Sequence, residues 1–441
     1  MDNAIFNNSI AAIFQKIVVF VNQFALVPIF ISCWGIQVYG DWIALTVIPT
    51  FFAYTNLGFG TAAATKIIHN YANKDYKTAN AYFKTGFFSI TALVVLLLIL
   101  SYLLLEFLCF FKIFDNLTIP FDEAFWGVYL IIVSGIIGFF NVLFEGIYNA
   151  LRKTALSIYL ASGLELFRII VLVIVLKNKA GVLVYAQVFF IVTFFSCLLY
   201  NLYAFYLVDF FGAKSKFDRV LFFQLLKKGT GYLTLSLWQV LLLQGATLIL
   251  RFVLGPISVV LFNTVRTLIN AGHQINSIIV RAILPEMKFN VGVGNVEKIK
   301  KTYSKSLLLG FLISLFFALF LLLCGKFIYS YWTNSELKIP NLMWILFLCS
   351  IPVKAIWWLS LTVFNAYDQP YIISKFSLLN ASIALLVALL GAHLFGIGGF
   401  TIGYILMDVL MLLIIFPKSL NMLQMNIIDV FSYVSLPYKF K

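Results

Sequence analysis

The sequence predicts an all-α, polytopic membrane protein whose twelve transmembrane helices form two parallel six-helix lobes around a central cleft. Only 11% of its residues are charged and 62% are hydrophobic, whereas a soluble domain carries about 25% charged residues. Apolar stretches near the length that spans a bilayer recur along all 441 residues. The short segments between these stretches alternate in Lys and Arg content, as cytoplasmic and outer loops do.

The apolar stretches place the twelve spans in order along the chain. We expect them near residues 10–32, 43–64, 86–110, 125–147, 156–176, 182–207, 230–253, 257–283, 306–325, 341–364, 376–395 and 399–417. The first stretch follows neither a basic segment nor a small-residue cleavage site. It is therefore expected to stay in the protein as a span and not to be removed as a signal peptide.

The basic residues predict the orientation of the chain. The segments 65–85, 148–155, 208–229, 284–305, 365–375 and 418–441 together hold 20 Lys and Arg residues. The alternate segments hold five, namely Lys112, Lys177, Lys179, Lys326 and Lys338. Because cytoplasmic loops carry the excess of basic residues, both termini are expected in the cytoplasm of a bacterial inner membrane. The net charge of +14 then reflects loop placement, and nucleic-acid binding is not expected.

The two halves of the chain resemble each other. Tyr148-Asn149-Ala150 and Phe364-Asn365-Ala366 are 216 residues apart, and the same offset pairs Tyr39-Gly40 with Gly255-Pro256. With six spans each, the halves point the same way, and substrate sites in such proteins lie at the interface between the halves. The charged link 208–229 predicts an N-terminal lobe of residues 1–212 and a C-terminal lobe of residues 213–441, with a cytoplasmic tail from residue 418.

Several kinds of chemistry find no support in the sequence. The five cysteines stand far apart with no CxxC pair, so we expect no metal site and no cofactor. The expected outer loops are too short to house an enzymatic domain. The G-x-G-x-x-A string that begins at Gly58 follows a membrane span and not a strand, so it does not indicate a nucleotide site.

The eighth expected span carries the richest polar stripe. Asn263, Arg266, Asn270, His273, Ser277 and Arg281 fall within a sector of about 80° on a helix. A charged residue deep in hydrocarbon costs about 2.5–3.5 kcal/mol on insertion scales, so such a stripe should face protein or a watery cavity. We interpret it as the lining of a cavity that holds an anionic group.

Other basic and polar residues within or beside the spans extend this predicted site. Lys16 and Gln23 share a face of the first span, Arg251 lies near the outer end of the seventh, and Lys66 follows the second. Arg suits a phosphate group because its planar fork donates two parallel hydrogen bonds, and Lys supplies a point charge. Near span ends, Arg251 and Arg281 could instead extend to the membrane surface.

Acidic residues within the spans are candidates for ion coupling. Glu165 and Arg168 are three residues apart, which favours an ion pair along one helix. Otherwise Glu165 is a candidate site for a proton or a sodium ion. Asp408 and Lys354 lie near mid-membrane, where each needs a partner, and they could pair with each other. Transport could thus be coupled to H⁺ or Na⁺, or to neither.

Two segments resemble motifs of polysaccharide transporters. Residues Tyr39-Gly40-Asp41-Trp42-Ile43-Ala44-Leu45 and then Asn56-Leu57-Gly58-Phe59-Gly60 resemble an outer YGxWxxL turn followed by a span that ends in D-L-G-x-G. Tyr148-Asn149-Ala150-Leu151-Arg152-Lys153 is similar to the family's NA-x-x-K turn. The chain thus resembles the Wzx-type O-antigen flippases of the multidrug/oligosaccharidyl-lipid/polysaccharide superfamily. One position departs from the pattern, because Asn56 stands where the family usually has Asp.

This resemblance implies a flippase and not an enzyme. Such a protein moves a polyprenyl-diphosphate-linked oligosaccharide of O-antigen, lipopolysaccharide or related polysaccharide biosynthesis across the inner membrane by alternating access. Its other expected partners are membrane lipids, a polysaccharide polymerase and chain-length proteins. The diphosphate would be held chiefly by Arg266 with Lys16, Lys66, Arg251 and Arg281.

Two alternative functions stay open on the sequence. A cation-coupled drug antiporter of the MATE type would use the same architecture but would favour an acidic, aromatic cavity. A membrane polysaccharide polymerase would also have many spans, but it would need a large outer loop for its reaction.

Overall fold

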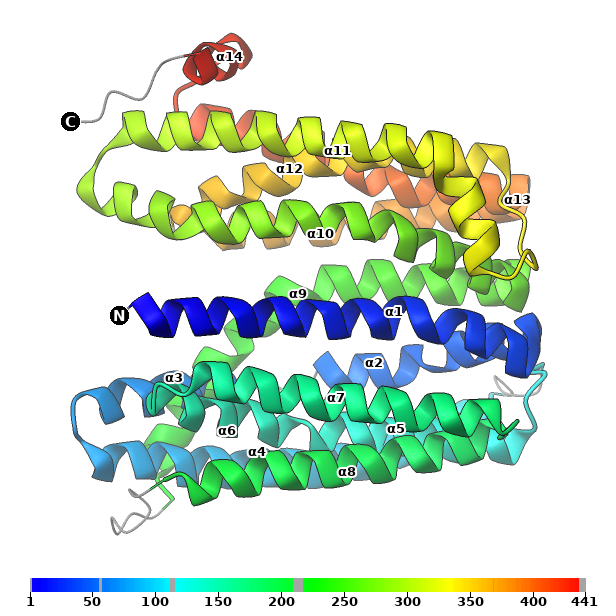
Figure 1. Cartoon of the computed structure of the whole chain (residues 1–441), viewed down its shortest axis with the longest axis horizontal. Helices are drawn as coiled ribbons and strands as arrows, with labels where there is room; N and C mark the ends of the chain where they lie inside the picture. The colour runs from blue at the N-terminus through cyan, green and yellow to red at the C-terminus, as the bar shows by residue number, and fades with distance from the viewer. Residues whose placement is uncertain (1, 55–57, 112–115, 209–216, 368, 436–441) are drawn as a thin grey trace. The chain divides into compact units, whose positions relative to one another are not determined.

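The computed structural model describes all residues except 1, 55–57, 112–115, 209–216, 368 and 436–441 (Figure 1). Within the described ranges every regular element is a helix, and the helices are numbered α1 to α14. The predicted all-α class is therefore confirmed.

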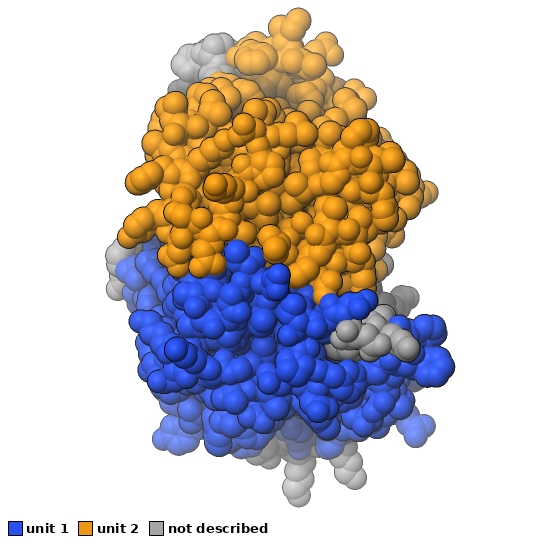
Figure 2. Space-filling model, turned by 90° about the vertical axis from the view of Figure 1, so that its right-hand side faces the viewer, with its two compact units in different colours: residues 1–236 blue, residues 237–441 orange. Residues whose placement is uncertain are grey.

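The chain divides into two compact units, Met1–Ser236 and Leu237–Lys441 (Figure 2). The lobe boundary predicted between residues 212 and 213 lies outside the described residues, so that boundary stays a prediction. Helix α9 (Arg219–Leu254) continues through the division after Ser236.

Unit 1 contains the helices that precede α9. They are α1 (Asp2–Leu45), α2 (Val47–Tyr54), α3 (Phe59–Ala72), α4 (Tyr76–Phe110), α5 (Phe121–Ile137), α6 (Phe139–Ala150), α7 (Thr154–Lys177) and α8 (Val182–Tyr206). Helix α1 packs on α7, α5 packs on α8, and α3 packs on both α4 and α6. Figure 1 shows these helices running side by side.

Unit 2 contains the second part of α9 and the five helices that follow. These are α10 (Pro256–Val293), α11 (Val296–Trp332), α12 (Asn341–Ala366), α13 (Pro370–Met422) and α14 (Ile427–Ser435). Helix α12 is central, because it packs on α10, α11 and α13. The short helix α14 packs on α11.

The predicted spans map onto these helices. Nine helical stretches in the described part of the chain are long and apolar enough to cross a membrane. Helix α13 covers two expected spans, with a non-helical break at Phe395–Gly396. Helix α1 covers the first expected span and the start of the second, with a break at Gly35, and most of the second expected span lies in α2 and α3. Helix α10 coincides with the eighth expected span but is not among the nine, because its polar stripe lowers its hydropathy. The chain is built as a multi-pass membrane protein.

The turn between the first two spans differs from the prediction. The hydropathy pattern predicts an outer loop at residues 33–42, but these residues are helical except at Gly35, whose φ of 76° and ψ of 166° change the chain direction at one residue. Side chains other than glycine are strained at such a positive φ. One glycine therefore replaces the expected ten-residue loop.

The backbone supports the internal repeat but corrects its register. Gly35 (φ 76°, ψ 166°) and Gly255 (φ 82°, ψ 177°) have matching conformations. Asp75 and Asn295 cap α4 and α11 in the same way, each accepting a hydrogen bond from the backbone N–H three residues later. Both pairs are separated by 220 residues, so the predicted pairing of Tyr39-Gly40 with Gly255-Pro256 was wrong. The matching ends of α6 and α12, at Ala150 and Ala366, keep the offset of 216.

Small residues bring α3 close to its neighbours. A Cβ atom added at Gly146 of α6 would lie 2.6 Å from the Cβ of Ala64, and one added at Gly86 of α4 would lie 2.9 Å from that of Ala63. In a membrane, helices gain little from apolar burial alone, so close packing of small residues is a main source of their association.

Candidate functional site

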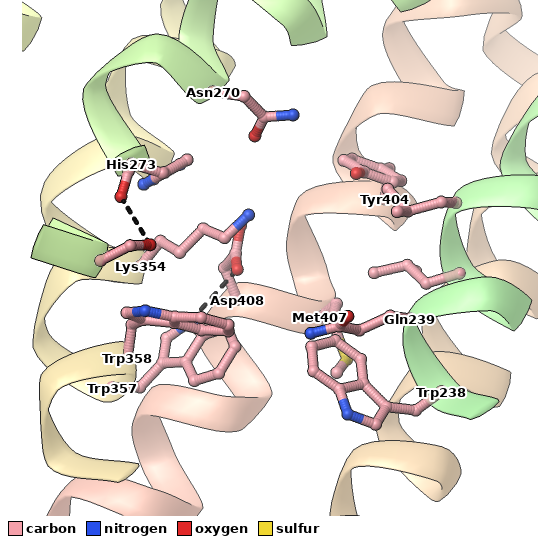
Figure 3. A pocket seen from close by; sticks show the side chains of 13 residues that line it. Trp238, Gln239, Asn270, His273, Lys354, Trp357, Trp358, Tyr404, Met407 and Asp408 are labelled. Atoms are coloured by element: carbon pink, nitrogen blue, oxygen red, sulfur yellow. Dashed lines mark hydrogen bonds between the residues drawn. The ribbon is translucent and has the colours of Figure 1, made fainter. Parts of the chain in front are cut away.

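A polar cavity lies inside unit 2 (Figure 3). Its volume is about 220 Å³. Its walls come from four helices that are distant in sequence. They contribute Trp238 and Gln239 from α9, Asn270, His273 and Ser277 from α10, Lys354, Trp357 and Trp358 from α12, and Tyr404, Met407 and Asp408 from α13.

An acid and a base face each other in this cavity. Asp408 is buried, and its Oδ1 accepts a hydrogen bond of 3.1 Å from the indole Nε1 of Trp357. The Lys354 side chain points toward Asp408 in Figure 3, and the two groups interact electrostatically. Because an isolated buried charge is costly, the presence of opposite charges in one cavity helps to accommodate both residues. The two charged side chains therefore face the same cavity of unit 2, and a direct ion pair between them stays a prediction.

The predicted stripe on α10 is only partly cavity lining. Asn270, His273 and Ser277 line the cavity, and the Ser277 hydroxyl donates a 3.3 Å hydrogen bond to the backbone carbonyl of His273. Two turns from His273 lies Arg266, which is half-buried. Arg281, two turns away in the other direction, is exposed. The middle of the stripe is thus the part that faces the cavity.

Arg266 is held by groups close to it. Its Nη2 donates to Asn263 Oδ1 at 2.5 Å, and its Nη1 donates to the backbone carbonyl of Leu243 at 3.5 Å. Its guanidinium lies 5.3 Å from the centre of the Phe262 ring. These contacts satisfy part of its donor capacity without any ligand. Its predicted role as the main phosphate-binding residue stays a prediction.

Four aromatic residues of the cavity were missed by sequence reasoning. They are Trp238, Trp357, Trp358 and Tyr404. The Trp357 ring centre lies 6.2 Å from that of Trp238 and 5.5 Å from that of Trp358. The sequence held a signal for the three tryptophans. Trp238, Trp357 and Trp358 do not lie at the outer ends of the expected spans, where an aromatic belt would place them.

A second polar cavity lies inside unit 1, between α6, α7 and α8, with a volume of about 270 Å³. Glu165 and Arg168 face it and form the predicted ion pair. Asn22 of α1 donates a 3.2 Å hydrogen bond to Glu165, and Arg168 donates a 3.1 Å bond to the hydroxyl of Thr193. The pair thereby links α1, α7 and α8. A role of Glu165 in ion coupling stays a prediction.

The remaining predicted site residues lie outside these two cavities. Lys16 is half-buried and Gln23 is exposed on α1. The Nζ of Lys66, on α3, lies 6.0 Å from the centre of the Tyr82 ring. Arg251 is half-buried in the last turn of α9. Their role at a substrate site stays a prediction.

The first family-like motif has a structural role. Asp41 is buried and accepts hydrogen bonds of 2.6 and 2.7 Å from the backbone N–H and the hydroxyl of Thr118. Tyr39 stacks on Phe30 with ring centres 4.9 Å apart. These contacts fix the turn after Gly35 to the segment before α5. Asn56, where the motif departs from the family, lies outside the described residues.

The described residues include no cluster of three or more His, Cys, Asp or Glu side chains that could hold a metal ion. The five cysteines are free thiols.

Comparisons with known proteins identify the fold. No family model and no curated protein matches the chain. Among solved structures, an inward-facing MATE multidrug resistance transporter of the MOP superfamily aligns with a TM-score of 0.73 and 16% identity, over 94% of this chain and 98% of that one. A ligand complex of the MATE multidrug transporter DinF-BH aligns with a TM-score of 0.65 and 16% identity, over 97% of both chains.

A third solved structure is a MOP superfamily transporter from Pyrococcus furiosus, for which reverse polarity of the binding pocket suggests a different function. It aligns with a TM-score of 0.64 and 16% identity, over 96% of this chain and 95% of that one. The chain is thus a helical membrane protein with two six-helix lobes. More particularly, it has the twelve-helix fold of MATE transporters of the MOP superfamily.

Proposed function

We propose that this chain is a membrane transporter that exchanges an aromatic organic cation for protons by alternating access, without covalent chemistry. The observation that carries this proposal is the cavity of unit 2, where three tryptophans and a tyrosine surround the Lys354–Asp408 pair. We place the protein in a bacterial inner membrane with both termini in the cytoplasm.

The aromatic walls suit a flat organic solute. Indole and phenol rings stack on apolar rings and attract cations through their faces, with about 0.5–2 kcal/mol for each cation–π contact. Met407 adds a flexible apolar side chain that can adapt to ligands of different shapes. Gln239 and Asn270 add groups that can donate and accept hydrogen bonds. Such a lining selects a chemical class and not a single molecule.

The two opposite charges of the cavity, Lys354 and Asp408, supply a means of exchange. With Asp408 ionised and Lys354 protonated, the pair is neutral, and the aromatic faces can hold a cation. A proton on Asp408 would leave the ammonium of Lys354 as the only charge of the pair, and like charges repel in a site of low dielectric. Protonation of Asp408 would thus expel a bound cation, and deprotonation would permit binding. This reciprocal relation is what proton-coupled antiport requires.

Transport by purified protein in liposomes tests this function. We would load liposomes with acidic buffer, dilute them into neutral buffer and follow the uptake of a fluorescent rhodamine cation. The wild type should accumulate the dye, and a protonophore should stop accumulation. Asp408→Asn should remove the dependence on the pH gradient, because its amide cannot exchange the proton.

Matched variants separate a specific site from general damage. Trp358→Leu should reduce uptake severalfold, whereas Trp126→Leu, at a half-exposed tryptophan of α5 in unit 1, should not. Equal uptake with and without the pH gradient in the wild type would refute proton-coupled export of this class of solute.

A second candidate function is the flippase that the sequence motifs resemble. It is favoured by the basic residues in and beside the spans, among them Lys16, Arg251 and Arg266, which outnumber acids there. A strain lacking the gene should then accumulate lipid-linked oligosaccharide on the inner leaflet and lose surface polysaccharide. Arg266→Ala should fail to restore export at normal protein level, and Lys338→Ala should restore it. Normal surface polysaccharide in the deletion strain would exclude this function.

A further inference from the structure

The C-terminal helix α14 covers one end of an apolar cavity in unit 2. The cavity has a volume of about 180 Å³, and every side chain that lines it is apolar. Its walls include Leu308 and Phe311 of α11, Ile356 of α12, Phe416 of α13, and Ile427 and Phe431 of α14. It shares no lining residue with the polar cavity around Asp408. It is therefore a separate feature of the molecule.

Helix α14 is amphipathic and exposes apolar side chains. At 100° per residue, Ile427, Ile428, Val430 and Phe431 occupy one arc of the helix, and Asp429, Ser432 and Tyr433 occupy the other. Val430 is buried against the core of unit 2, but Ile428 is 80% exposed and Phe431 is 62% exposed. Such a helix is stable at a membrane surface with its apolar side in the upper acyl-chain region.

Polar contacts fix α14 beside the first turns of α11. The Tyr433 hydroxyl donates a 3.0 Å hydrogen bond to Glu297. Lys300 donates a 3.4 Å bond to the backbone carbonyl of Gln424, just before α14. Asp429 accepts a 2.7 Å bond from the backbone N–H of Asn426 and caps the start of the helix. The position of α14 over the cavity is thus specified by side chains on both partners.

Positive charge lies beside the mouth of this cavity. The first turns of α11 carry Lys298, Lys300, Lys301 and Lys305 and one acid, Glu297. Lys298 forms a 3.2 Å ion pair with Glu286 of α10, so its charge does not add to the excess. Around the axis of α11, the Lys300 side chain leaves the helix within about 20° of the directions of Leu307 and Phe311. Along the axis, Lys300 lies about 10 Å before Leu307 and about 16 Å before Phe311. The known hydrogen-bond partner of Lys300 is a neutral carbonyl, so its charge is not cancelled by that contact.

We propose that this cavity binds an acyl chain of an anionic phospholipid, with the phosphate group at Lys300 and Lys301. A phospholipid joins a charged head to an apolar chain over a distance similar to that between Lys300 and the cavity wall. Basic clusters beside membrane helices attract anionic head groups, and an apolar cavity stays free of water and can take up an apolar group. The site is independent of the proposed transport function.

Native mass spectrometry of the full-length protein tests the site. Detergent-purified protein would be titrated with phosphatidylglycerol or with phosphatidylcholine of the same chains, and the apparent Kd of the first bound lipid would be measured. We expect phosphatidylglycerol to bind at least tenfold more tightly, because each lysine near the head group contributes about fivefold. Equal affinity for the two lipids would overturn the proposal.

Two matched pairs of variants localise the binding. Lys300→Glu should lower the preference for phosphatidylglycerol at least fivefold, and Lys338→Glu, at an exposed lysine elsewhere in unit 2, should not. Leu308→Trp, which fills the cavity, should weaken binding of both lipids, whereas Leu309→Trp, at the exposed neighbouring position, should not. Circular dichroism and gel filtration verify that each variant is folded.

Competition distinguishes a lipid from a simple anion. Inorganic phosphate at millimolar concentration should not displace phosphatidylglycerol, because it has no chain to occupy the cavity. Full displacement by phosphate, or unchanged lipid binding in Leu308→Trp, would show that the cavity takes no part in binding.

Discussion

Removing one member of the Lys354–Asp408 pair should destabilise unit 2 more than removing both. In Asp408→Asn, the side-chain oxygen can still accept the hydrogen bond from Trp357, but Lys354 loses its counter-charge. Removing one partner of a buried ion pair that is in direct contact costs about 3–5 kcal/mol. Asp408 is only 8% exposed, whereas Lys354 is half-buried and borders the cavity. We therefore expect the lower end of that range, about 3 kcal/mol.

The double variant Lys354→Met/Asp408→Leu separates pairing from other effects. Replacing a buried ion pair by apolar residues of similar volume is often close to neutral, so the double variant should be within about 1 kcal/mol of the wild type. Lys354→Met alone leaves a buried carboxylate without a counter-charge and should cost about as much as Asp408→Asn. The coupling energy of the cycle would then exceed about 2 kcal/mol, well above the value for independent sites.

Equilibrium unfolding in mixed detergent micelles, followed by tryptophan fluorescence, measures these free energies. Trp357 contacts Asp408 directly and reports on the site. A cost below about 0.5 kcal/mol for both single variants, which is the size of an ordinary surface substitution, would show that the two charges do not depend on each other. Additive single costs in the double variant would lead to the same conclusion.

Three further substitutions test the fold. Gly146→Val should separate α6 from α3, because a Cβ at this position would lie 2.7 Å from the Ala64 Cα. We expect the unfolding temperature to fall by several degrees. An unchanged unfolding temperature would refute the close packing of α6 on α3. Asp41→Ala should remove both hydrogen bonds to Thr118 at a cost of about 1–3 kcal/mol, measured by chemical unfolding, whereas Asp41→Asn should recover part of this loss. Gly35→Ala should cost about 1–2 kcal/mol because its φ is positive, and Gly163→Ala, inside α7 with open space around its Cβ position, should be neutral or stabilising in the same assay.

The sequence by itself determined the features that depend on local composition and periodicity. Hydrophobic stretches predicted membrane helices because their length and apolarity must match the bilayer. The three-residue spacing of Glu165 and Arg168 was enough to predict their ion pair, since such neighbours meet on one helix face.

The end of an element proved harder to predict than its presence. Polar and aromatic residues gather at residues 33–42 and predict an outer loop there, but Gly35 alone turns the chain. The hydropathy pattern does not reveal that one glycine adopts a positive φ and turns the chain. The repeat register was displaced for the same reason, since the offset of 216 pairs Tyr39 with Gly255, whereas the backbone conformation pairs Gly35 with Gly255.

Only the tertiary structure decided which polar residues share a cavity. Trp238, Lys354 and Asp408 come from three helices, and their meeting depends on how α9, α12 and α13 cross. The polar stripe on α10 was visible in the sequence, but its division into cavity-lining His273 and internally bonded Arg266 was not. Helical periodicity gives the direction in which a side chain leaves its own helix. It does not give the neighbouring helix that the side chain meets, and this neighbour decides whether a buried charge finds a partner or a cavity.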